Sequence, residues 1–221
     1  MGICTQEYWK FVYICDKMDA GFFYWPACSA CFYMKYETVL ERQIGEMKNI
    51  TVKDIVNATG GFLLCGDEDT PIKGLCIDSR KAQAGDLFIP LLGNKVDGHR
   101  FIEPAMERAS ATLTSEHDNV VISEKPFIRV DDTMKALQAI GKDIRGRYDI
   151  PYIGVTGSVG KTTTREMIAA AVGTGRHCFQ TNGNENSQIG VPMTLSRMTD
   201  GYDAAVIEMG ISEPGQMEIL S

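Results

Sequence analysis

A glycine-rich loop, Thr156-Gly-Ser-Val-Gly-Lys-Thr-Thr163, separates a β-branched stretch of the chain from an alanine-rich stretch. Gly157 and Gly160 permit a tight turn in which successive backbone N–H groups point inward. The N-terminal end of the helix that follows adds partial positive charge, so phosphate oxygens would bind there. The pattern predicts a strand, a phosphate-binding loop and a helix, which together open a parallel α/β sheet.

The residue types in this loop indicate individual roles in binding a nucleotide. Lys161 is expected to reach the β- and γ-phosphates, and the Thr162 hydroxyl is expected to bind Mg²⁺. The rest of the loop completes the predicted cofactor site, with Thr156, Gly157, Ser158, Gly160 and Thr163. Val155 stands where the strict eight-residue P-loop pattern has its first glycine, so an ordinary glycine-rich turn remains an alternative.

A carboxylate ends the predicted strand at 204–208. An acidic side chain at the C-terminal end of a parallel strand faces the ligand crevice, so Glu208 is predicted to bind Mg²⁺ together with Thr162. Lys161 and Glu208 are therefore the candidate catalytic residues. A solvated glutamate at the end of a strand is the alternative interpretation.

The segment that contains the loop alternates between predicted strands and predicted helices. Strands are expected at 152–156, 178–181 and 204–208, and helices from Gly160 to about Thr174, from Val191 to Met198 and from Pro214 onward. This order predicts a parallel sheet with right-handed crossovers over residues 151–221. About three strands precede Ser221, and open α/β sheets usually have more, so we expect a partial domain in a truncated chain.

A smaller α/β domain is predicted at 47–150, before the loop. Runs typical of β-strands at 75–78, 87–92, 111–114 and 127–130 alternate with turn residues and with a helical stretch at 101–109. Residues 51–54 have the sequence of a capping box for a helix that ends at Thr59, before two glycines. A longer helix is expected from Asp131 or Asp132 to Tyr148, because apolar residues recur there at helical spacing. The predicted fold class is α/β, with a small α/β domain followed by an incomplete P-loop-type parallel α/β domain.

Residues 1–46 differ in composition from the rest of the chain. They hold 11 of the 19 aromatic residues and four of the seven cysteines. We therefore predict an atypical N-terminal extension, which a translated upstream region or a misassigned start would explain. Its longest uncharged, aromatic-rich run, residues 20–34, contains Pro26 and is shorter than the ~20 apolar residues of a membrane-spanning helix. No membrane span is expected.

The charge balance narrows the class of partner. Lys and Arg total 22 and Asp and Glu total 29, which gives a net charge of −7. This balance disfavours a protein that binds nucleic acid through many phosphate contacts, so a phosphate ligand must be held locally.

The seven cysteines are odd in number and scattered, which favours reduced thiols. The N-terminus lacks a signal-peptide pattern, and the predicted location is therefore the cytoplasm. Cys28 and Cys31 have half of a zinc-site spacing, but a second pair is missing. No zinc site is predicted.

Asn94-Lys-Val-Asp97 matches the pattern by which GTPases read guanine, and in circularly permuted GTPases this pattern precedes the phosphate-binding loop. However, no Asp-x-x-Gly sequence follows Lys161, and the loop pattern is imperfect. A polar turn is the better interpretation of residues 94–97. A preference for GTP over ATP is the observation that would favour a permuted GTPase.

Three groups of motifs resemble the Mur ligase family. They are T-G-S-V-G-K-T-T-T at 156–164, N-G-N-E-N-S-Q-I-G-V-P-M-T-L at 182–195 and V-I-E-M-G at 206–210. The strings I-D-S-R-K at 77–81, G-D-L-F-I-P-L-L-G at 85–93 and D-G-H-R-F at 97–101 resemble the family's N-terminal UDP-binding domain. The resemblance extends over about residues 47–221.

This resemblance implies an ATP-dependent ligase that forms an amide bond. A carboxylate of UDP-N-acetylmuramoyl-tripeptide would attack the γ-phosphate of ATP, and the amine of D-alanyl-D-alanine would take the resulting acyl phosphate. ATP and Mg²⁺ are the implied cofactors, and peptidoglycan precursor synthesis is the implied pathway. The protein would act as a monomer. A member that adds a single amino acid is the alternative within the family.

The family's C-terminal parts, which close over ATP and receive the second substrate, would lie beyond Ser221. We therefore expect no activity from this chain alone, because closure completes such sites. A non-catalytic fragment that binds a nucleotide or a UDP-sugar is a further hypothesis.

The resemblance also assigns residues to the substrates. Asn184 and Asn186 match the family's asparagine-bearing loop and would orient nucleotide or substrate groups. Ser187 replaces the second residue of a commoner Asn-Asn pair, and a turn formed by Asn and Gly is the alternative interpretation of the loop.

Two short stretches match positions on the UDP side. They comprise Asp78, Ser79 and Arg80 in the first stretch, and Asp97 and His99 in the second. Arg80 would pair with a diphosphate, because its planar guanidinium can bind two oxygens at once. For His99, a residue of a surface turn is the alternative interpretation.

Overall fold

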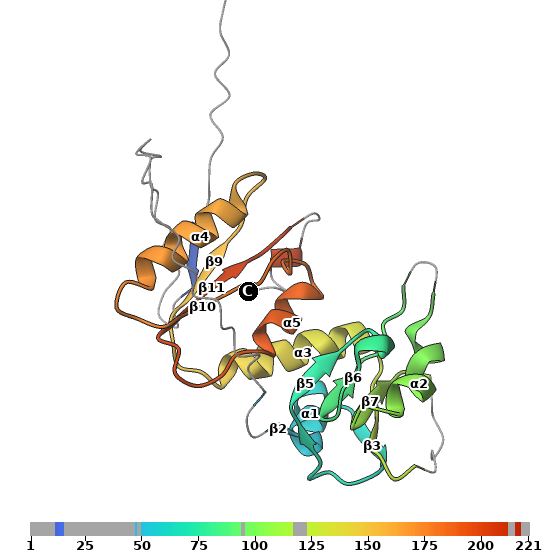
Figure 1. Ribbon diagram of the computed structural model, residues 1–221. Helices are drawn as coiled ribbons and strands as arrows, with labels where there is room; N and C mark the ends of the chain where they lie inside the picture. Colours follow the sequence, from blue (N-terminus) through green and yellow to red (C-terminus); the bar gives the residue numbers. More distant parts are fainter. Residues whose placement is uncertain are drawn as a thin grey trace, which may run out of the picture. The chain divides into compact units, whose positions relative to one another are not determined.

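The computed structural model describes residues 12–15, 47, 50–93, 96–116, 123–211 and 215–217. The chain divides into two compact units. The first unit comprises residues 45–149 and 182–200, and the second unit comprises residues 150–181 and 201–221 together with the N-terminal segment that contains strand β1. Figure 1 labels most of the helices and strands of both units.

In the described part of the first unit, five strands form a sheet in the order β3-β8-β7-β6-β5. They are β3 (Phe62–Cys65), β5 (Gly74–Cys76), β6 (Asp86–Phe88), β7 (Ala111–Thr114) and β8 (Phe127–Arg129). Strands β5 to β8 pair in parallel, and β3 pairs antiparallel with β8. A separate antiparallel pair joins β2 (Ile50–Thr51) to β4 (Pro71–Ile72).

The predicted strands of this unit are confirmed in position, and their ends differ by a few residues. The run at 87–92 stops early, since β6 ends at Phe88 before Pro90, which has no N–H to donate to a neighbouring strand. Strand β3 was not predicted, because Phe62–Cys65 lacks the alternation of a half-buried strand and lies directly after a helix.

The helices of the first unit begin where capping residues predict. Helix α1 (Val52–Thr59) starts with a capping box in which the backbone N–H of Thr51 donates to Asp54 Oδ2 at 2.8 Å. Helix α3 (Thr133–Gly146) starts after Asp132, whose carboxylate accepts from the backbone N–H groups of Met134 and Lys135. The helical stretch predicted at 101–109 is the shorter helix α2 (Ile102–Met106).

Short 3-10 turns lie between these elements, η1 at Ser79–Lys81 and η2 at Gly98–Phe101. Both begin after an aspartate whose side chain accepts a backbone hydrogen bond, Asp78 for η1 and Asp97 for η2. The two turns therefore place the predicted UDP-side residues in ordered positions.

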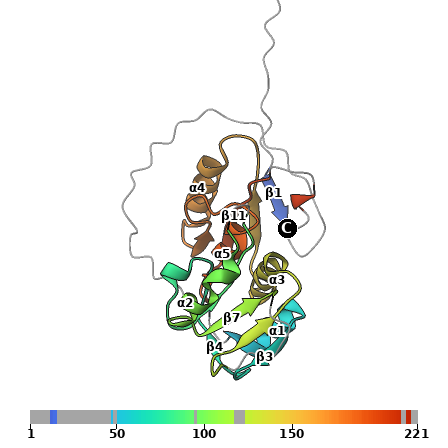
Figure 2. The ribbon, with the colours of Figure 1, turned by 90° about the vertical axis from the view of Figure 1, so that its right-hand side faces the viewer.

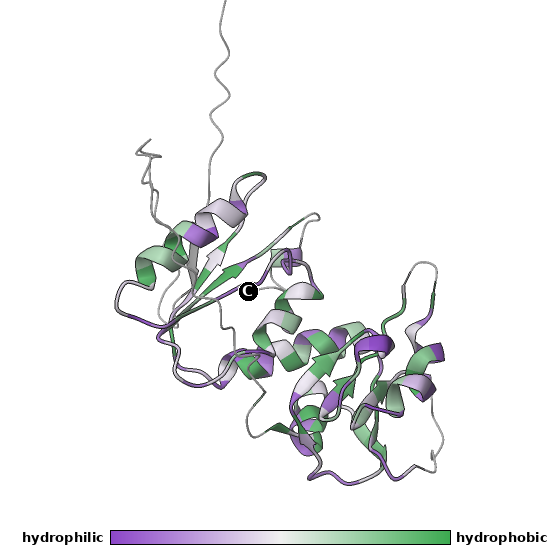
Figure 3. Cartoon of the chain, in the orientation of Figure 1, coloured by the Kyte–Doolittle hydropathy of each residue, from purple (hydrophilic) through white to green (hydrophobic). Residues whose placement is uncertain are grey.

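The core of the first unit lies on both faces of its sheet. Leu87 and Ile89 pack in one buried cluster with helices α1 and α3, through residues that include Ile55 and Leu137. Phe88 points to the opposite face and packs with residues of α2. Figure 3 shows hydrophobic residues along these strands and hydrophilic residues in many of the connecting turns.

Residues 182–200 were predicted to lie with the second sheet, but they group with the first unit. Helix α5 (Gly190–Leu195) packs against α3, and the two are neighbours in Figure 1. A Cβ atom at Gly141 would lie 2.9 Å from Pro192 Cβ, so the glycine makes room for the contact. Tyr148 Oη donates to the carbonyl of Met198 at 2.9 Å and holds the end of the segment. The linear boundaries at 46/47 and 150/151 stay predictions.

The second unit contains the predicted parallel strands. These are β9 (Tyr152–Val155), β10 (Cys178–Gln180) and β11 (Ala204–Glu208), and the described sheet has the order β1-β9-β11-β10. Both β9 and β10 run parallel to β11. Helix α4 (Lys161–Val172) begins within the glycine-rich loop and packs on β11. It changes from hydrophilic residues at its start to hydrophobic residues at its end (Figure 3).

Strand β1 (Val12–Cys15) belongs to the stretch that composition set apart. It pairs antiparallel with β9, with Val12 opposite Val155, and lies at the end of the sheet (Figure 2). The origin proposed for residues 1–46 stays a prediction.

Some other predictions lie partly or wholly outside the described residues. Cys28, Cys31, Asn94, Lys95 and most of the helix predicted from Pro214 belong there. Cys65, Cys76 and Cys178 carry free thiols. None of the helices in the described segments has the length and apolarity that crossing a bilayer requires.

Candidate functional site

The glycine-rich loop has the backbone that its sequence predicts. Gly157 and Gly160 have φ values of 145° and 73°, a region that residues with a Cβ rarely adopt. Helix α4 starts directly after Gly160, and the N–H of Thr164 makes its first bond to the Gly160 carbonyl at 2.9 Å. The loop therefore ends at a helix N-terminus, which favours anions.

Lys161 is the first residue of this helix, and its side chain folds back over the loop. Its ammonium donates to the Gly157 carbonyl at 2.9 Å, and the residue is half-buried. Thr156 is also half-buried, whereas Ser158, Thr162 and Thr163 are exposed. A positive charge is thus held against the turn of the loop.

Glu208 is brought to the loop by the register of the sheet. It stands opposite Val155, the last residue of β9 before the loop, and its backbone N–H donates to Thr181 Oγ1 at 2.8 Å. The residue is only 1% exposed, and Oε1 lies 3.4 Å from Thr162 Oγ1. The alternative of a solvated strand-end glutamate is therefore wrong.

The Thr162 and Glu208 oxygens suit a hard divalent cation. Mg²⁺ takes oxygen ligands and binds proteins through one or two carboxylates together with phosphate oxygens. A buried carboxylate beside a hydroxyl at the start of a phosphate-binding helix supplies that kind of ligand. The two predicted metal ligands are therefore together in the structure.

Arg165 was missed by sequence reasoning. Its NH1 lies 3.2 Å from Glu208 Oε2 and its NH2 lies 2.5 Å from Glu166 Oε1, while the residue is 3% exposed. The available signal was its spacing, since Arg165 follows Lys161 by four residues on one helix face. Arg165 therefore lies on the same side of α4 as Lys161, the residue predicted to bind phosphate.

The predicted UDP-side residues lie near the C-terminal ends of the parallel strands β5, β6 and β7, the edge where open α/β sheets bind ligands. Arg80 pairs with Asp78 through two hydrogen bonds, Nε to Oδ1 at 2.9 Å and NH2 to Oδ2 at 2.8 Å. This pairing lowers the pKa of Asp78 to about 2. Ser79 is half-buried, and the Arg80 side chain is 85% exposed, so its remaining N–H groups face solvent.

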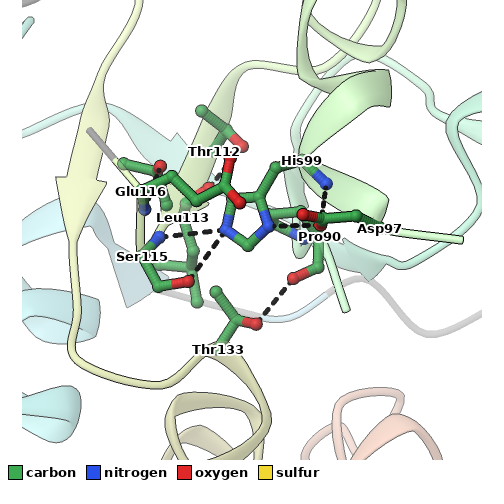
Figure 4. A network of polar contacts seen from close by, with 9 residues as sticks. Pro90, Asp97, His99, Thr112, Leu113, Ser115, Glu116 and Thr133 are labelled. Carbon is green, nitrogen blue, oxygen red and sulfur yellow. Dashed lines mark hydrogen bonds and ion pairs between the residues drawn. The ribbon is translucent and has the colours of Figure 1, made fainter. Parts of the chain in front are cut away.

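His99 is buried within the network of polar contacts in Figure 4, so the alternative of a surface turn residue is wrong. Its Nδ1 lies 2.7 Å from Asp97 Oδ1, which also accepts from the His99 backbone N–H at 2.9 Å. Its Nε2 accepts from the Ser115 backbone N–H at 3.0 Å, and therefore carries no proton. The proton of the neutral ring is consequently on Nδ1 and is donated to Asp97.

These contacts tie together segments that follow different strands. The two hydrogen bonds from His99 lower the pKa of Asp97 to about 2. Thr133 Oγ1 donates to the Pro90 carbonyl at 2.6 Å and fastens the start of α3 to the chain beyond β6. Gly98 allows the close approach, because a Cβ there would lie 2.6 Å from the Leu91 nitrogen. Ser115 and Thr133 carried no signal in the sequence.

Asp97, His99 and Glu116 also have potential ligand atoms within 4.8 Å of one another. The ring of His99 has no lone pair left for a metal, because Nδ1 carries a proton and Nε2 accepts from Ser115. We therefore assign this cluster to the support of the strand ends. Asp97 also forms an isolated antiparallel bridge with Leu92. The polar-turn interpretation of residues 94–97 stays a prediction, because Asn94 and Lys95 lie outside the described residues.

The asparagine loop belongs to the first unit, next to α5. Asn184 is exposed and Asn186 is half-buried, and the backbone N–H of Asn186 donates to the Asn184 carbonyl at 2.8 Å. Glu185 anchors the loop, since its Oε2 accepts from Thr194 Oγ1 at 2.9 Å and also pairs with Arg197. The loop is thus ordered by a residue that the predictions did not single out.

Two family models match the chain. The Mur ligase family catalytic domain matches residues 71–145, and the Mur ligase middle domain matches residues 155–221. The chain belongs to the Mur ligase family. The predicted resemblance is therefore confirmed, and it includes both units.

Two relatives of this Mur ligase chain carry the same name. The UDP-N-acetylmuramoyl-tripeptide–D-alanyl-D-alanine ligase of Bacillus subtilis (strain 168) is 41% identical over 173 residues, which are 77% of this chain and 38% of the relative. The ligase of the same name from Synechocystis sp. is 40% identical over 70% of this chain and 34% of the relative. The chain thus spans less than two fifths of the length of these curated relatives.

Solved structures agree with the fold. The crystal structure of MurF from Acinetobacter baumannii has a TM-score of 0.69 and 30% identity over 77% of this chain and 38% of that chain. A MurF ligase from Thermotoga maritima, solved in complex with ADP, has a TM-score of 0.61 and 30% identity over 66% of this chain and 34% of that chain. The predicted α/β class with parallel sheets is confirmed by these likenesses.

Proposed function

We propose that this Mur ligase chain takes part in the ATP-dependent joining of UDP-N-acetylmuramoyl-tripeptide to D-alanyl-D-alanine, a step of peptidoglycan precursor synthesis. The observation that carries the proposal is the contact between Thr162 and the buried Glu208 beside a phosphate-binding loop. The names of the relatives support the choice of substrates over a ligase that adds one amino acid.

On the nucleotide side, the second unit would bind ATP. Backbone N–H groups of residues 157–160 and the α4 N-terminus would hold phosphate oxygens, and Lys161 would exchange its bond to Gly157 for a phosphate oxygen. Thr162 and Glu208 would hold Mg²⁺, which neutralises charge on the phosphates when bound. The ADP complex of the Thermotoga maritima relative supports ATP as the nucleotide.

On the substrate side, the first unit would bind the UDP moiety at the C-terminal edge of β5, β6 and β7. The exposed guanidinium of Arg80 would pair with the diphosphate. Asp97 and His99 would shape the edge, since they bind one another and His99 also accepts a hydrogen bond from Ser115. Asn184 and Asn186 would orient polar groups of the nucleotide or the substrate.

The reaction proceeds in two steps. A carboxylate oxygen of the tripeptide attacks the γ-phosphorus, the bond to the β-phosphate oxygen breaks, and ADP leaves. The amine of D-alanyl-D-alanine then attacks the carbonyl carbon of the acyl phosphate, and inorganic phosphate leaves as the amide forms and a proton is lost. No protein nucleophile is required, so the chain contributes position and charge.

The test is calorimetric titration of the full chain with UDP-N-acetylmuramoyl-tripeptide, with Mg-ATP and with Mg-GTP. We expect binding of the UDP substrate and a preference for ATP. Binding of GTP alone, or no binding of the UDP substrate by a chain whose first unit is folded, would refute the proposal. Adding D-alanyl-D-alanine and assaying amide formation separates a ligase from a fragment that only binds.

A further inference from the structure

Two oppositely charged side chains are almost fully buried in the second unit. Arg165 is 3% exposed and Glu208 is 1% exposed. Charged groups are seldom buried unless they are paired, because removing them from water is costly. Arg165 NH1 and Glu208 Oε2 are 3.2 Å apart, so the two charges compensate each other.

The two oxygens of Glu208 have different partners. Oε1 faces the Thr162 hydroxyl at 3.4 Å, and Oε2 faces the Arg165 guanidinium. The backbone of Glu208 is fixed by the strand register and by the hydrogen bond to Thr181. The last torsion of a glutamate is otherwise broad, so an untethered carboxylate would rotate and lose this orientation.

Arg165 is itself held from its other side. Its NH2 lies 2.5 Å from Oε1 of Glu166, whose side chain is 41% exposed. A planar guanidinium offers several N–H groups in a fixed plane, and can join two carboxylates in a way that a lysine ammonium does less well. Glu166 thus anchors Arg165, and Arg165 tethers Glu208.

We infer that Arg165 is a positioning residue for the proposed metal-binding carboxylate. By binding Oε2 of Glu208, it keeps Oε1 directed at Thr162, where the divalent cation of a bound nucleotide would be held. This inference rests on the proposed function, because it concerns the same nucleotide site.

A cation beside a metal-binding carboxylate has two possible effects of opposite sign. It can compete with the metal for the carboxylate, or it can orient the carboxylate for the metal. The structure favours orientation, because Arg165 binds the oxygen that does not face Thr162. Groups that orient a metal ligand typically change metal affinity by about 10- to 100-fold when they are replaced.

The experiment measures ADP binding to the full chain by calorimetry, once with excess Mg²⁺ and once with a chelator. The variants are Arg165→Met, Arg165→Lys and, as a matched control, Arg176→Met, which removes an exposed arginine of the same unit. We expect Arg165→Met to reduce the Mg²⁺-dependent gain in ADP affinity by about 10-fold or more. ADP binding without Mg²⁺ should not change in Arg165→Met. Arg165→Lys should restore part of the Mg²⁺-dependent gain, and Arg176→Met should stay close to the wild type.

A second measurement uses Mn²⁺ in place of Mg²⁺. The ADP complex of the chain is titrated with Mn²⁺, and binding is followed by the electron paramagnetic resonance of the metal. Weaker Mn²⁺ binding by Arg165→Met would support the inference. An equal loss of ADP affinity with and without the metal would indicate a purely structural residue and overturn it. Stronger metal binding by the variant would indicate competition and overturn it as well.

Failure of the proposed function gives a different result. If the folded wild-type chain binds no ADP, the nucleotide site itself is refuted. If the wild type binds ADP with a Mg²⁺-dependent gain that Arg165→Met retains, only the role of Arg165 is refuted. Circular dichroism shows whether Arg165→Met is unfolded. In that case Arg165→Lys is the deciding variant: a Mg²⁺-dependent gain in ADP affinity smaller than that of the wild type supports the inference, and an equal gain refutes it.

Discussion

His99 is held at both ring nitrogens, and each contact fixes the position of a proton. Replacing His99 with Leu would leave the Ser115 N–H and the Asp97 carboxylate without these partners. We expect His99→Leu to lower the free energy of unfolding by about 1–3 kcal/mol, measured by urea titration. His177 is exposed, so His177→Leu is the control and should change stability by less than about 0.5 kcal/mol. Equal effects of the two substitutions would contradict the assigned network.

Asp97 makes the stability of the first unit depend on pH. Its pKa is lowered to about 2 from an ordinary value of 3.8, so the folded state favours the charged form. The stabilisation is complete above the ordinary value and is lost as the pH falls through about 2. We expect Asp97→Asn to be less stable at pH 6 and to lose less stability on acidification, as measured by urea unfolding at pH 6 and pH 2.5.

Asp86 provides the opposite sign for comparison. Burial raises its pKa, so the charged form is less favourable in the folded chain than in the unfolded chain. Protonation of Asp86 therefore stabilises the folded wild-type chain as the pH falls. Asp86→Asn should lack this gain in stability on acidification. An acid response of Asp97→Asn equal to that of the wild type would rule out the assigned role of Asp97.

Lys161 carries the charge that the proposed nucleotide site presents to the phosphates. A hydrogen bond to a charged group contributes about 1.5–3 kcal/mol, so Lys161→Met should weaken ADP binding by roughly 10- to 100-fold in calorimetry. Binding of the UDP substrate should be unchanged. Lys135→Met removes an exposed lysine from α3 and should leave ADP affinity unaltered. Similar losses in both variants would indicate a general effect of charge.

The packing of α5 on α3 depends on a glycine at the contact. A methyl group at Gly141 would lie 2.9 Å from Pro192 Cβ and 3.0 Å from its Cα, whereas a methyl group at Gly146 meets nothing within 4 Å. Overpacking costs about 1–3 kcal/mol, against a gain of up to about 1 kcal/mol in helix propensity. We expect Gly141→Ala to lower the midpoint of thermal unfolding and Gly146→Ala to leave it unchanged or raised. A stabilised Gly141→Ala chain would show that the contact is absent in solution.

Helices and strands whose ends are set by local residues were predicted closely. Thr51 with Asp54, and Asp132, cap α1 and α3 where the sequence indicates. The position of α5 was not predictable in the same way. Its apolar residues identify a helix, but they suit any apolar surface, and packing on α3 depends on Gly141, about 50 residues earlier in the sequence.

For the molecule as a whole, each ligand should protect its own unit. Hydrogen exchange of the full chain with UDP-N-acetylmuramoyl-tripeptide should slow most in residues 77–81, 97–101 and 114–116, near the strand ends of the first unit. Mg-ADP should slow exchange most in residues 156–163. Mg-GTP is the control nucleotide in the same experiment, because a preference for the adenine nucleotide is expected. Protection of the first-unit residues by Mg-ADP, with none at 156–163, would contradict the division of the two sites.

The sequence by itself determined the strand, loop and helix around Lys161. It also determined that the later strands run parallel, and it identified the family. These features depend on residues close together in the chain, where glycine conformations, capping groups and periodicity act locally. Only the tertiary structure decided that Glu208 is buried with Arg165, that His99 is buried with Ser115 and that α5 packs on α3. Each of these contacts joins residues at least 16 positions apart, and strand register and side-chain packing, which no local pattern encodes, bring them together.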